Sequence, residues 1–115
     1  MPITITDANV TLMVQNLDRA IHFYQSIGLK LKDRWGDHYA MVTAPGVTIG
    51  LHPSNEFKNS SGNASIGFFI ADVSEARTLL KKHSVAFKEE TGKSGHHFNF
   101  EDPDGNRLYF VKPAW

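Results

Sequence analysis

Hydrophobic and polar residues alternate near the start of the chain, and the pattern then changes to a helical spacing. Val10, Leu12 and Val14 stand at every second position, which is typical of a strand with one buried face. The following segment runs from Asn16, a residue suited to an N-cap, to Gly28, a residue suited to the end of a helix. Its apolar stripe recurs at helical spacing and comprises Leu17, Ala20, Ile21, Tyr24 and Ile27.

Three further strands are predicted after this helix. They cover residues 29–35 (LKLKDRW), 38–43 (HYAMVT) and 47–53 (VTIGLHP). Gly36-Asp37 and Ala44-Pro45-Gly46 separate them, and both stretches have the composition of turns. The first half of the chain therefore predicts the order β-α-β-β-β.

The same order returns in the second half of the chain. Ile66, Phe68 and Ile70 alternate, and Asp72 suits the N-cap of a second helix. The apolar stripe predicted for that helix comprises Val73, Ala76, Leu79, Leu80 and His83. The three strands predicted after it cover residues 85–90, 96–101 and 106–112, with a turn at Asp102–Gly105 between the last two.

The repeat predicts two modules, residues 8–53 and 64–113, joined by a polar linker at 54–63, within a single domain of 115 residues. A single four-stranded module has exposed sheet edges and too small a core to be stable alone. We therefore expect an α+β fold in which the two βαβββ modules pair into a curved mixed sheet. Its helices would cover the outer face, and its other face would form a cup.

Two stretches resemble signature segments of a known family. VQNLDRAIHFYQSIGLKL and FEDPDGNRLYFVKP are similar to those of the vicinal oxygen chelate superfamily, which includes glyoxalase I, extradiol dioxygenases, and the fosfomycin and bleomycin resistance proteins. The resemblance covers residues 8–113. It implies the fold more specifically than the reaction, because one fold hosts many functions.

Alternation also assigns the strand residues to faces. On the helix side we expect Val10, Leu12, Val14, Ile66, Phe68, Ile70, Phe98, Phe100, Leu108 and Phe110. On the cup side we expect Asn9, Thr11, Met13, Tyr39, Met41, His52, Ser65, Gly67, Phe69, His97, Asn99, Arg107 and Tyr109. An apolar and aromatic lining with a few polar groups suits a small organic ligand. The predicted ligand-binding residues are Tyr39, Met41, His52, Phe69, His97, Asn99, Arg107 and Tyr109.

Some of these side chains have an alternative interpretation. Arg107 either orients an anionic or carbonyl group of the ligand or reaches solvent. Trp35 and Tyr39 either stack on a flat ligand at the mouth of the cup or pack in the core or an interface.

The resemblance implies four metal-ligand positions, which in this chain are Asn9, Gly50, Ser65 and Tyr109. Glycine offers no side-chain donor, and amide, hydroxyl and neutral phenol groups are poor ligands for divalent transition metals. We therefore predict no metal and no other cofactor. The alternative is that His52 and His97 rebuild a metal site from other positions.

The amino-acid composition argues against some classes of chemistry and binding partner. The chain has no cysteine, which excludes thiolate chemistry, and its 12 basic and 12 acidic residues balance without forming a block of like charge. Neither a nucleic-acid surface nor a membrane span is expected. We predict a cytoplasmic protein. The resemblance, together with the sheet edges that need covering, implies that it forms a homodimer.

Three functions fit these observations. The favoured hypothesis is a metal-independent binding protein for a small organic molecule, of the glyoxalase and bleomycin-resistance type. The second is a glyoxalase-like lyase, isomerase or hydrolase that uses His97, Tyr109 or a displaced metal. The third is a non-catalytic scaffold domain whose cup is filled by its own side chains.

Overall fold

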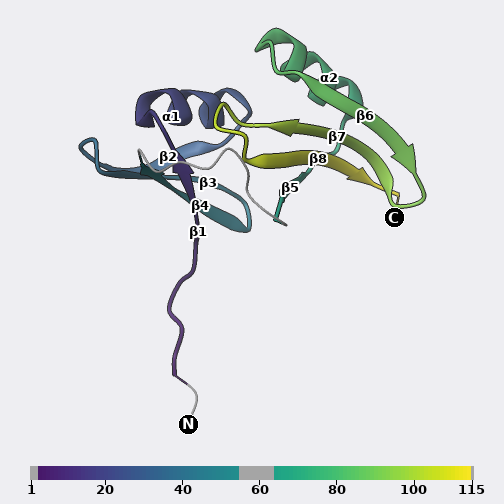
Figure 1. Cartoon of the computed structure of the whole chain (residues 1–115). Coiled ribbons are helices and arrows are strands. Elements are labelled where there is room, and N and C mark those ends of the chain that lie inside the picture. Colours follow the sequence, from purple (N-terminus) through teal and green to yellow (C-terminus); the bar gives the residue numbers. More distant parts are fainter. Residues whose placement is uncertain (1–2, 55–63, 115) are drawn as a thin grey trace. The chain divides into compact units, whose positions relative to one another are not determined.

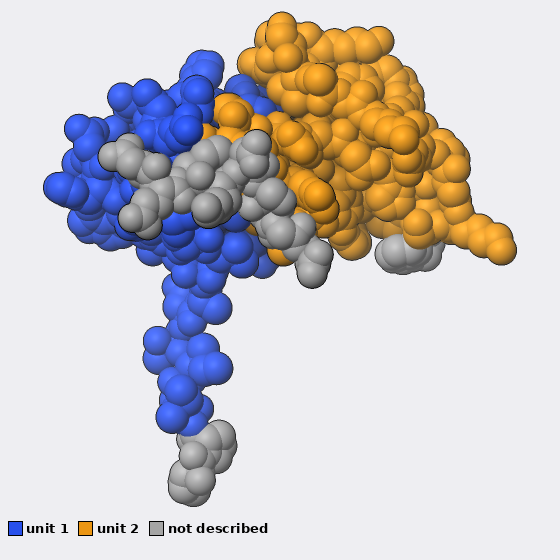
Figure 2. All heavy atoms as spheres, viewed as in Figure 1, with its two compact units in different colours: residues 1–57 blue, residues 58–115 orange. Residues whose placement is uncertain are grey.

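A computed structural model describes residues 3–54 and 64–114 of the chain. The chain divides into two compact units, residues 1–57 and 58–115 (Figure 2). Except for Ser54, the predicted linker at 54–63 lies outside the described residues. No helix in the described part of the chain is long and apolar enough to cross a membrane.

The first unit has the predicted β-α-β-β-β order (Figure 1). Its elements are β1 (Val10–Val14), α1 (Leu17–Ser26), β2 (Lys30–Trp35), β3 (Tyr39–Ala44) and β4 (Val47–Pro53). The four strands form one sheet in the order β1-β4-β3-β2. The sheet is mixed, because β1 runs parallel to β4 while the other neighbouring strands are antiparallel.

Helix α1 begins and ends where the sequence predicts. The side-chain oxygen of Asn16 accepts a hydrogen bond from the backbone N–H of Arg19 at 2.9 Å, so it caps the first turn. Gly28 follows the helix with φ of +114°, a conformation that glycine adopts without steric cost. The helix packs against β2, β3 and β4, and its buried residues are Leu17, Ala20, Ile21 and Tyr24.

One face of this sheet is buried beneath the helix. Its buried side chains are Leu12, Val14, Ala40, Val42, Ile49 and Leu51. Val10 was also expected on the buried side, and it is paired in register with Ile49, yet 46% of it is exposed. Val10 is the first residue of an edge strand and has a neighbouring strand on one side only, which leaves it less covered than Leu12.

The second unit repeats this architecture. Its elements are β5 (Ile66–Phe69), α2 (Val73–Lys82), β6 (Phe87–Gly92), β7 (Gly95–Glu101) and β8 (Arg107–Pro113). The sheet order is β5-β8-β7-β6, and β5 runs parallel to β8. The predicted α+β fold of two βαβββ modules is thus confirmed.

The largest boundary difference is in β6, which was predicted at residues 85–90. It begins at Phe87 because the backbone N–H of Val85 still bonds to the carbonyl oxygen of Leu80 at 2.9 Å, completing the end of α2. His83 is likewise not part of the buried stripe. It is the exposed C-cap residue, and its N–H bonds to the carbonyl oxygen of Leu79 at 3.1 Å.

Four apolar side chains of β7 and β8 form the core of the second unit. Phe98, Phe100, Leu108 and Phe110 are all buried, as predicted from alternation. The rings of Phe100 and Phe110 are 5.0 Å apart between centroids. Ala76 and Leu80 are the buried residues of α2, whose N-cap Asp72 accepts a hydrogen bond from Glu75 N–H at 3.0 Å.

The turn between β7 and β8 is fixed by one buried carboxylate. Asp102 accepts hydrogen bonds from the backbone N–H groups of Asp104 and Asn106, both at 2.9 Å, and from the side-chain amide of Asn106 at 2.9 Å. Gly105 donates its N–H to the carbonyl oxygen of Asp102 and has φ of +85°. These contacts form the turn that the sequence predicts at Asp102–Gly105.

Candidate functional site

The helix-free face of the first sheet carries the predicted ligand-binding residues of this unit. Met41 and Gly50 are paired in register, as are Met13 and His52, so their side chains share this face. Tyr39 and Met41 are half-buried, whereas His52 is exposed. The structure therefore places Tyr39, Met41 and His52 on the expected side of the sheet.

Tyr39 lies across the neighbouring strand and covers Gly50. A Cβ atom at Gly50 would collide with the Tyr39 hydroxyl and would stand 2.7 Å from the hydroxyl oxygen of Thr11. The Tyr39 hydroxyl is also 3.0 Å from the side-chain nitrogen of Asn9, which donates to it, and 3.0 Å from the Thr11 hydroxyl. Only glycine fits at position 50 while this phenol keeps its place.

Trp35 extends the aromatic surface next to Tyr39. The two residues are paired in register between β2 and β3, and their rings are 5.7 Å apart at an interplanar angle of 37°. Trp35 is 47% exposed. The helix-free face of the first unit therefore presents an aromatic surface beside a set of hydrogen-bonding groups.

The second unit carries the remaining predicted ligand-binding residues on the equivalent face. Tyr109 is paired in register with Asn99 and Gly67, and Val111 with His97 and Phe69. His97 and Tyr109 are half-buried, with ring centroids 5.9 Å apart. The exposed residues of this set are Phe69, Asn99 and Arg107.

A second tyrosine covers a second glycine in this unit. A Cβ atom at Gly67 of β5 would collide with the ring and hydroxyl of Tyr109 from β8. The pairing was missed from the sequence, where alternation assigned Gly67 and Tyr109 to one face without predicting contact. The available signal was a glycine inside each strand, Gly50 and Gly67, because such a glycine often marks a close approach by another group.

The residues at the family's metal-ligand positions do not fit a divalent transition metal. Gly50 has no donor and its space is taken by Tyr39, while Asn9 donates its amide hydrogen to the same phenol. Ser65 and Tyr109 offer only hydroxyl groups. Within residues 3–54 and 64–114, no three or more His, Cys, Asp or Glu side chains gather closely enough to hold a metal ion.

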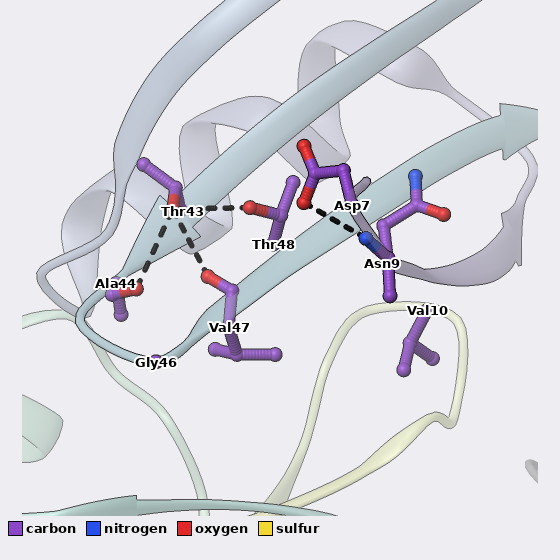
Figure 3. A pocket seen from close by; sticks show the side chains of 9 residues that line it. Asp7, Asn9, Val10, Thr43, Ala44, Gly46, Val47 and Thr48 are labelled. Carbon is purple, nitrogen blue, oxygen red and sulfur yellow. Dashed lines mark hydrogen bonds between the residues drawn. The ribbon is translucent and has the colours of Figure 1, made fainter. Parts of the chain in front are cut away.

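A shallow pocket of about 440 Å³ lies at the turn end of the first sheet (Figure 3). The Thr43 hydroxyl donates to the carbonyl oxygen of Val47 at 3.0 Å and stands 3.4 Å from the Thr48 hydroxyl. Asp7 is the one charged residue in its lining, which comprises Asp7, Ala8, Asn9, Val10, Thr43, Ala44, Gly46, Val47 and Thr48. Because its lining holds no second acidic or basic side chain beside Asp7, the pocket offers polar contacts rather than an acid–base pair.

A charged cluster lies on the helix side of the second unit. Glu89 of β6 bonds to Arg77 of α2 at 2.6 and 3.1 Å and to the His96 ring at 2.6 Å. The Arg77 hydrogen bonds are the main cause that lowers the pKa of Glu89 to about 2, and the His96 hydrogen bond adds to this effect. His96 also contacts Phe98, with ring centroids 5.2 Å apart.

Comparison with known proteins identifies relatives of the whole chain. The family described as "Glyoxalase/Bleomycin resistance protein/Dioxygenase superfamily" matches residues 8–110. An uncharacterized protein of Mycolicibacterium smegmatis is 31% identical over 111 residues, which is 90% of each chain.

Solved structures with the same fold include two resistance proteins. The fosfomycin resistance protein FosX of Listeria monocytogenes has a TM-score of 0.80 at 19% identity, covering 97% of this chain and 96% of that one. A bleomycin-binding protein solved in complex with bleomycin has a TM-score of 0.73 at 15% identity, covering 94% of this chain and 98% of the other. At these identities the likeness shows the fold alone.

Proposed function

Because this chain belongs to the Glyoxalase/Bleomycin resistance protein/Dioxygenase superfamily, we propose that it binds a small organic molecule on the helix-free faces of its sheets without a resident metal. The observation that carries this proposal is the Tyr39 phenol. It fills the space above Gly50 and engages Asn9, so that two of the family's ligand positions are committed to a neutral hydrogen-bond cluster.

The chemistry of both faces favours a flat, partly polar ligand. Trp35, Tyr39 and Met41 offer exposed or half-buried aromatic and thioether surface in the first unit. In the second unit, Phe69 is 68% exposed and lies on the same face as the His97–Tyr109 pair. Aromatic surface beside a few donors and acceptors is the usual composition of a small-molecule site.

The proposed contacts divide into two roles. Tyr39 and Met41 on the face of the first unit, and Phe69 on the face of the second, each pack against the flat part of a ligand bound at that face, and the other residues orient its polar edge. The orienting residues are His52, His97, Asn99, Arg107 and Tyr109. The solved complex of a bleomycin-binding protein supports this proposal, because its fold accommodates an organic ligand.

Binding is tested by titrating the protein with a library of aromatic metabolites while tryptophan fluorescence and heat are recorded. A ligand of about 20 heavy atoms at about 0.3 kcal/mol per atom binds with a Kd of tens of micromolar. We expect Tyr109→Phe to weaken a hydrogen-bonded ligand by about 1 kcal/mol and to preserve the fold.

Phe69→Ala is expected to reduce binding further, whereas Phe87→Ala is the matched control. Phe87 lies on the helix side, with its ring 5.6 Å from that of Phe98. Equal loss of affinity in both variants would show that the helix-free face is not the binding surface.

The same library distinguishes binding from catalysis, because products are measured after incubation. Turnover of a ligand such as a methylglyoxal–glutathione adduct would favour the glyoxalase-like alternative, in which His97 or Tyr109 transfers a proton. We also propose that the protein acts in the cytoplasm as a homodimer.

A further inference from the structure

Three side chains of the β6–β7 hairpin are connected by hydrogen bonds on the helix side of the second unit. Thr91 of β6 and His96 of β7 are paired in register, and the Thr91 hydroxyl oxygen is 3.0 Å from Nδ1 of His96. The other ring nitrogen of His96, Nε2, is 2.6 Å from Oε2 of Glu89. We call Thr91, His96 and Glu89 the triad.

Glu89 determines which ring nitrogen of His96 carries the proton. Arg77 bonds to both carboxylate oxygens of Glu89, at 3.1 and 2.6 Å, and is the main cause that lowers the pKa of this residue to about 2. Glu89 is therefore an anion at neutral pH, and its carboxylate only accepts hydrogen bonds. In the neutral imidazole Nε2 must then be the donor, which leaves the lone pair of Nδ1 facing the Thr91 hydroxyl.

The members of the triad differ in their exposure to solvent. Thr91 is exposed, whereas only 23% of the His96 side chain and 29% of the Glu89 side chain are accessible. His96 also lies against the buried ring of Phe98, with centroids 5.2 Å apart. Thr91 is β-branched, which restricts the rotation of its hydroxyl group. A reagent in solution therefore reaches the hydroxyl, while the imidazole beside it is held in a fixed orientation.

A hydroxyl, an imidazole and a carboxylate that are hydrogen-bonded in this order form the arrangement that activates a nucleophile for acyl transfer. We propose that Thr91 is a nucleophilic site for activated esters, with His96 as its general base and Glu89 as the residue that positions His96. General-base assistance contributes about 100- to 10,000-fold to a rate, so esters with a good leaving group are the expected acyl donors.

The proposed transfer uses only the ester and the side chains of the triad. Oγ of Thr91 forms a bond to the carbonyl carbon of the ester while its proton passes to Nδ1 of His96. The bond between that carbon and the ester oxygen then breaks, and His96 returns the proton to the departing oxygen. The products are an acylated Thr91 and a free alcohol or phenol.

This site is separate from the faces proposed to bind a ligand. His97 follows His96 in β7 and lies on the helix-free face, with its ring centroid 5.9 Å from that of Tyr109. The inference therefore does not rest on the proposed function, and ligand binding and Thr91 acylation are measured with different reagents.

The reaction of the full chain with p-nitrophenyl acetate tests the proposal. Release of p-nitrophenolate gives the rate, and peptide mass spectrometry locates the acetyl group. We expect Thr91 to be acetylated at least about 10-fold faster than Thr4, an exposed threonine in the segment before β1. Equal acetylation of the two threonines would overturn the proposal.

Two histidine variants test the general base. His96→Gln is expected to slow the acetylation of Thr91 by about 100-fold, because the amide cannot accept the proton. His83→Gln is the matched control, since it removes an exposed histidine of the same unit, and is expected to keep the rate within about twofold. Equal losses in both variants, or an unchanged rate in His96→Gln, would contradict the role of His96. Circular dichroism shows whether each variant keeps its fold.

Thr91→Ser is a variant that keeps the hydroxyl. The introduced serine is expected to be acetylated at a rate within about tenfold of wild-type Thr91. Absence of the acetyl group from position 91 in this folded variant would overturn the proposal.

NMR of the nitrogen-labelled imidazole tests the positioning role of Glu89 at about pH 8, where an ordinary histidine is neutral. The ring proton of His96 is expected on Nε2 in the wild type. Glu89→Ala is expected to lose this preference and to acetylate Thr91 at least about fivefold more slowly. A wild-type proton on Nδ1 would overturn the proposal, because no lone pair would then face the Thr91 hydroxyl.

Discussion

Tyr39 and Gly50 show how a pair of residues shapes the helix-free face of the first sheet. The phenol lies where a side chain at position 50 would project, and its hydroxyl is held by Asn9 and Thr11 at 3.0 Å each. Tyr109 and Gly67 repeat the arrangement in the second unit. At position 50, the neutral phenol of Tyr39 thus fills the space that a metal-coordinating side chain would require.

A double-mutant cycle measures this contact. Gly50→Ala is expected to lower the free energy of unfolding by about 1–3 kcal/mol, because its methyl group overlaps the Tyr39 hydroxyl. In a Tyr39→Ala background the same substitution is expected to cost less than half as much. Urea denaturation of the four proteins provides the values, and an equal cost in both backgrounds would contradict the proposed contact.

At the scale of elements, a turn and a charged cluster connect segments that are distant in the sequence. The carboxylate of Asp102 organises the β7–β8 turn by accepting three hydrogen bonds while only 5% exposed. The Arg77–Glu89–His96 cluster joins α2 to β6 and β7. The turn leads directly into β8, which carries Tyr109.

Asp102→Ala is expected to lower the free energy of unfolding by about 2–4 kcal/mol, because three buried donors lose a charged acceptor. Asp37→Ala in the β2–β3 turn is the matched control. Asp37 forms an ion pair with Arg34 at 3.1 Å but its side chain is 92% exposed, so a loss below about 0.5 kcal/mol is expected. Chemical denaturation compares the two variants, and similar losses would argue against a special role for the buried turn.

The Arg77–Glu89–His96 cluster on the helix side of the second unit is expected to stabilise the fold less at acidic pH. The pKa of Glu89 is lowered from 4.5 to about 2 in the folded chain, so its stabilising effect is present above pH 4.5 and is lost as the pH falls toward 2. Glu89→Gln should therefore reduce the fall in unfolding free energy between about pH 6, which lies above this window, and about pH 3, which lies within it. Glu90→Gln, altered at the next residue of β6, is the control that keeps the wild-type fall.

At the scale of the whole molecule, two modules of the same β-α-β-β-β order carry the proposed binding faces. The family's fold is retained over residues 8–110. The positions that the resemblance assigns to metal ligands hold Asn9, Gly50, Ser65 and Tyr109. Retention of the fold without those donors is the basis for proposing a binding protein whose stability is independent of metal.

Metal independence is tested on the purified protein. We expect substoichiometric zinc, nickel, iron and manganese by elemental analysis, and a melting temperature that changes by less than about 2 °C after treatment with a chelator. A tightly bound metal would contribute linked binding energy, so its removal would lower the melting temperature. About one metal ion per chain would contradict this part of the proposal.

Local sequence patterns predicted the order of the elements and the faces of most strand residues. Several features depend only on local backbone geometry. They are the alternation in Val10–Val14, the apolar stripe of α1, the caps at Asn16 and Asp72, and the turn at Asp102. These signals lie within a few residues of one another. They therefore predicted the βαβββ order and placed Tyr109 on the face opposite Phe98 and Phe110.

The tertiary structure decided which side chains touch. Tyr39 covers Gly50 from a neighbouring strand, and Glu89 meets Arg77 across 12 sequence positions, because register and rotamers bring together residues that no local pattern connects. It also showed that Ile3 and Ile5 lack a buried environment despite their apolar alternation. Periodicity specifies the direction in which a side chain points, whereas packing against other segments determines what it meets.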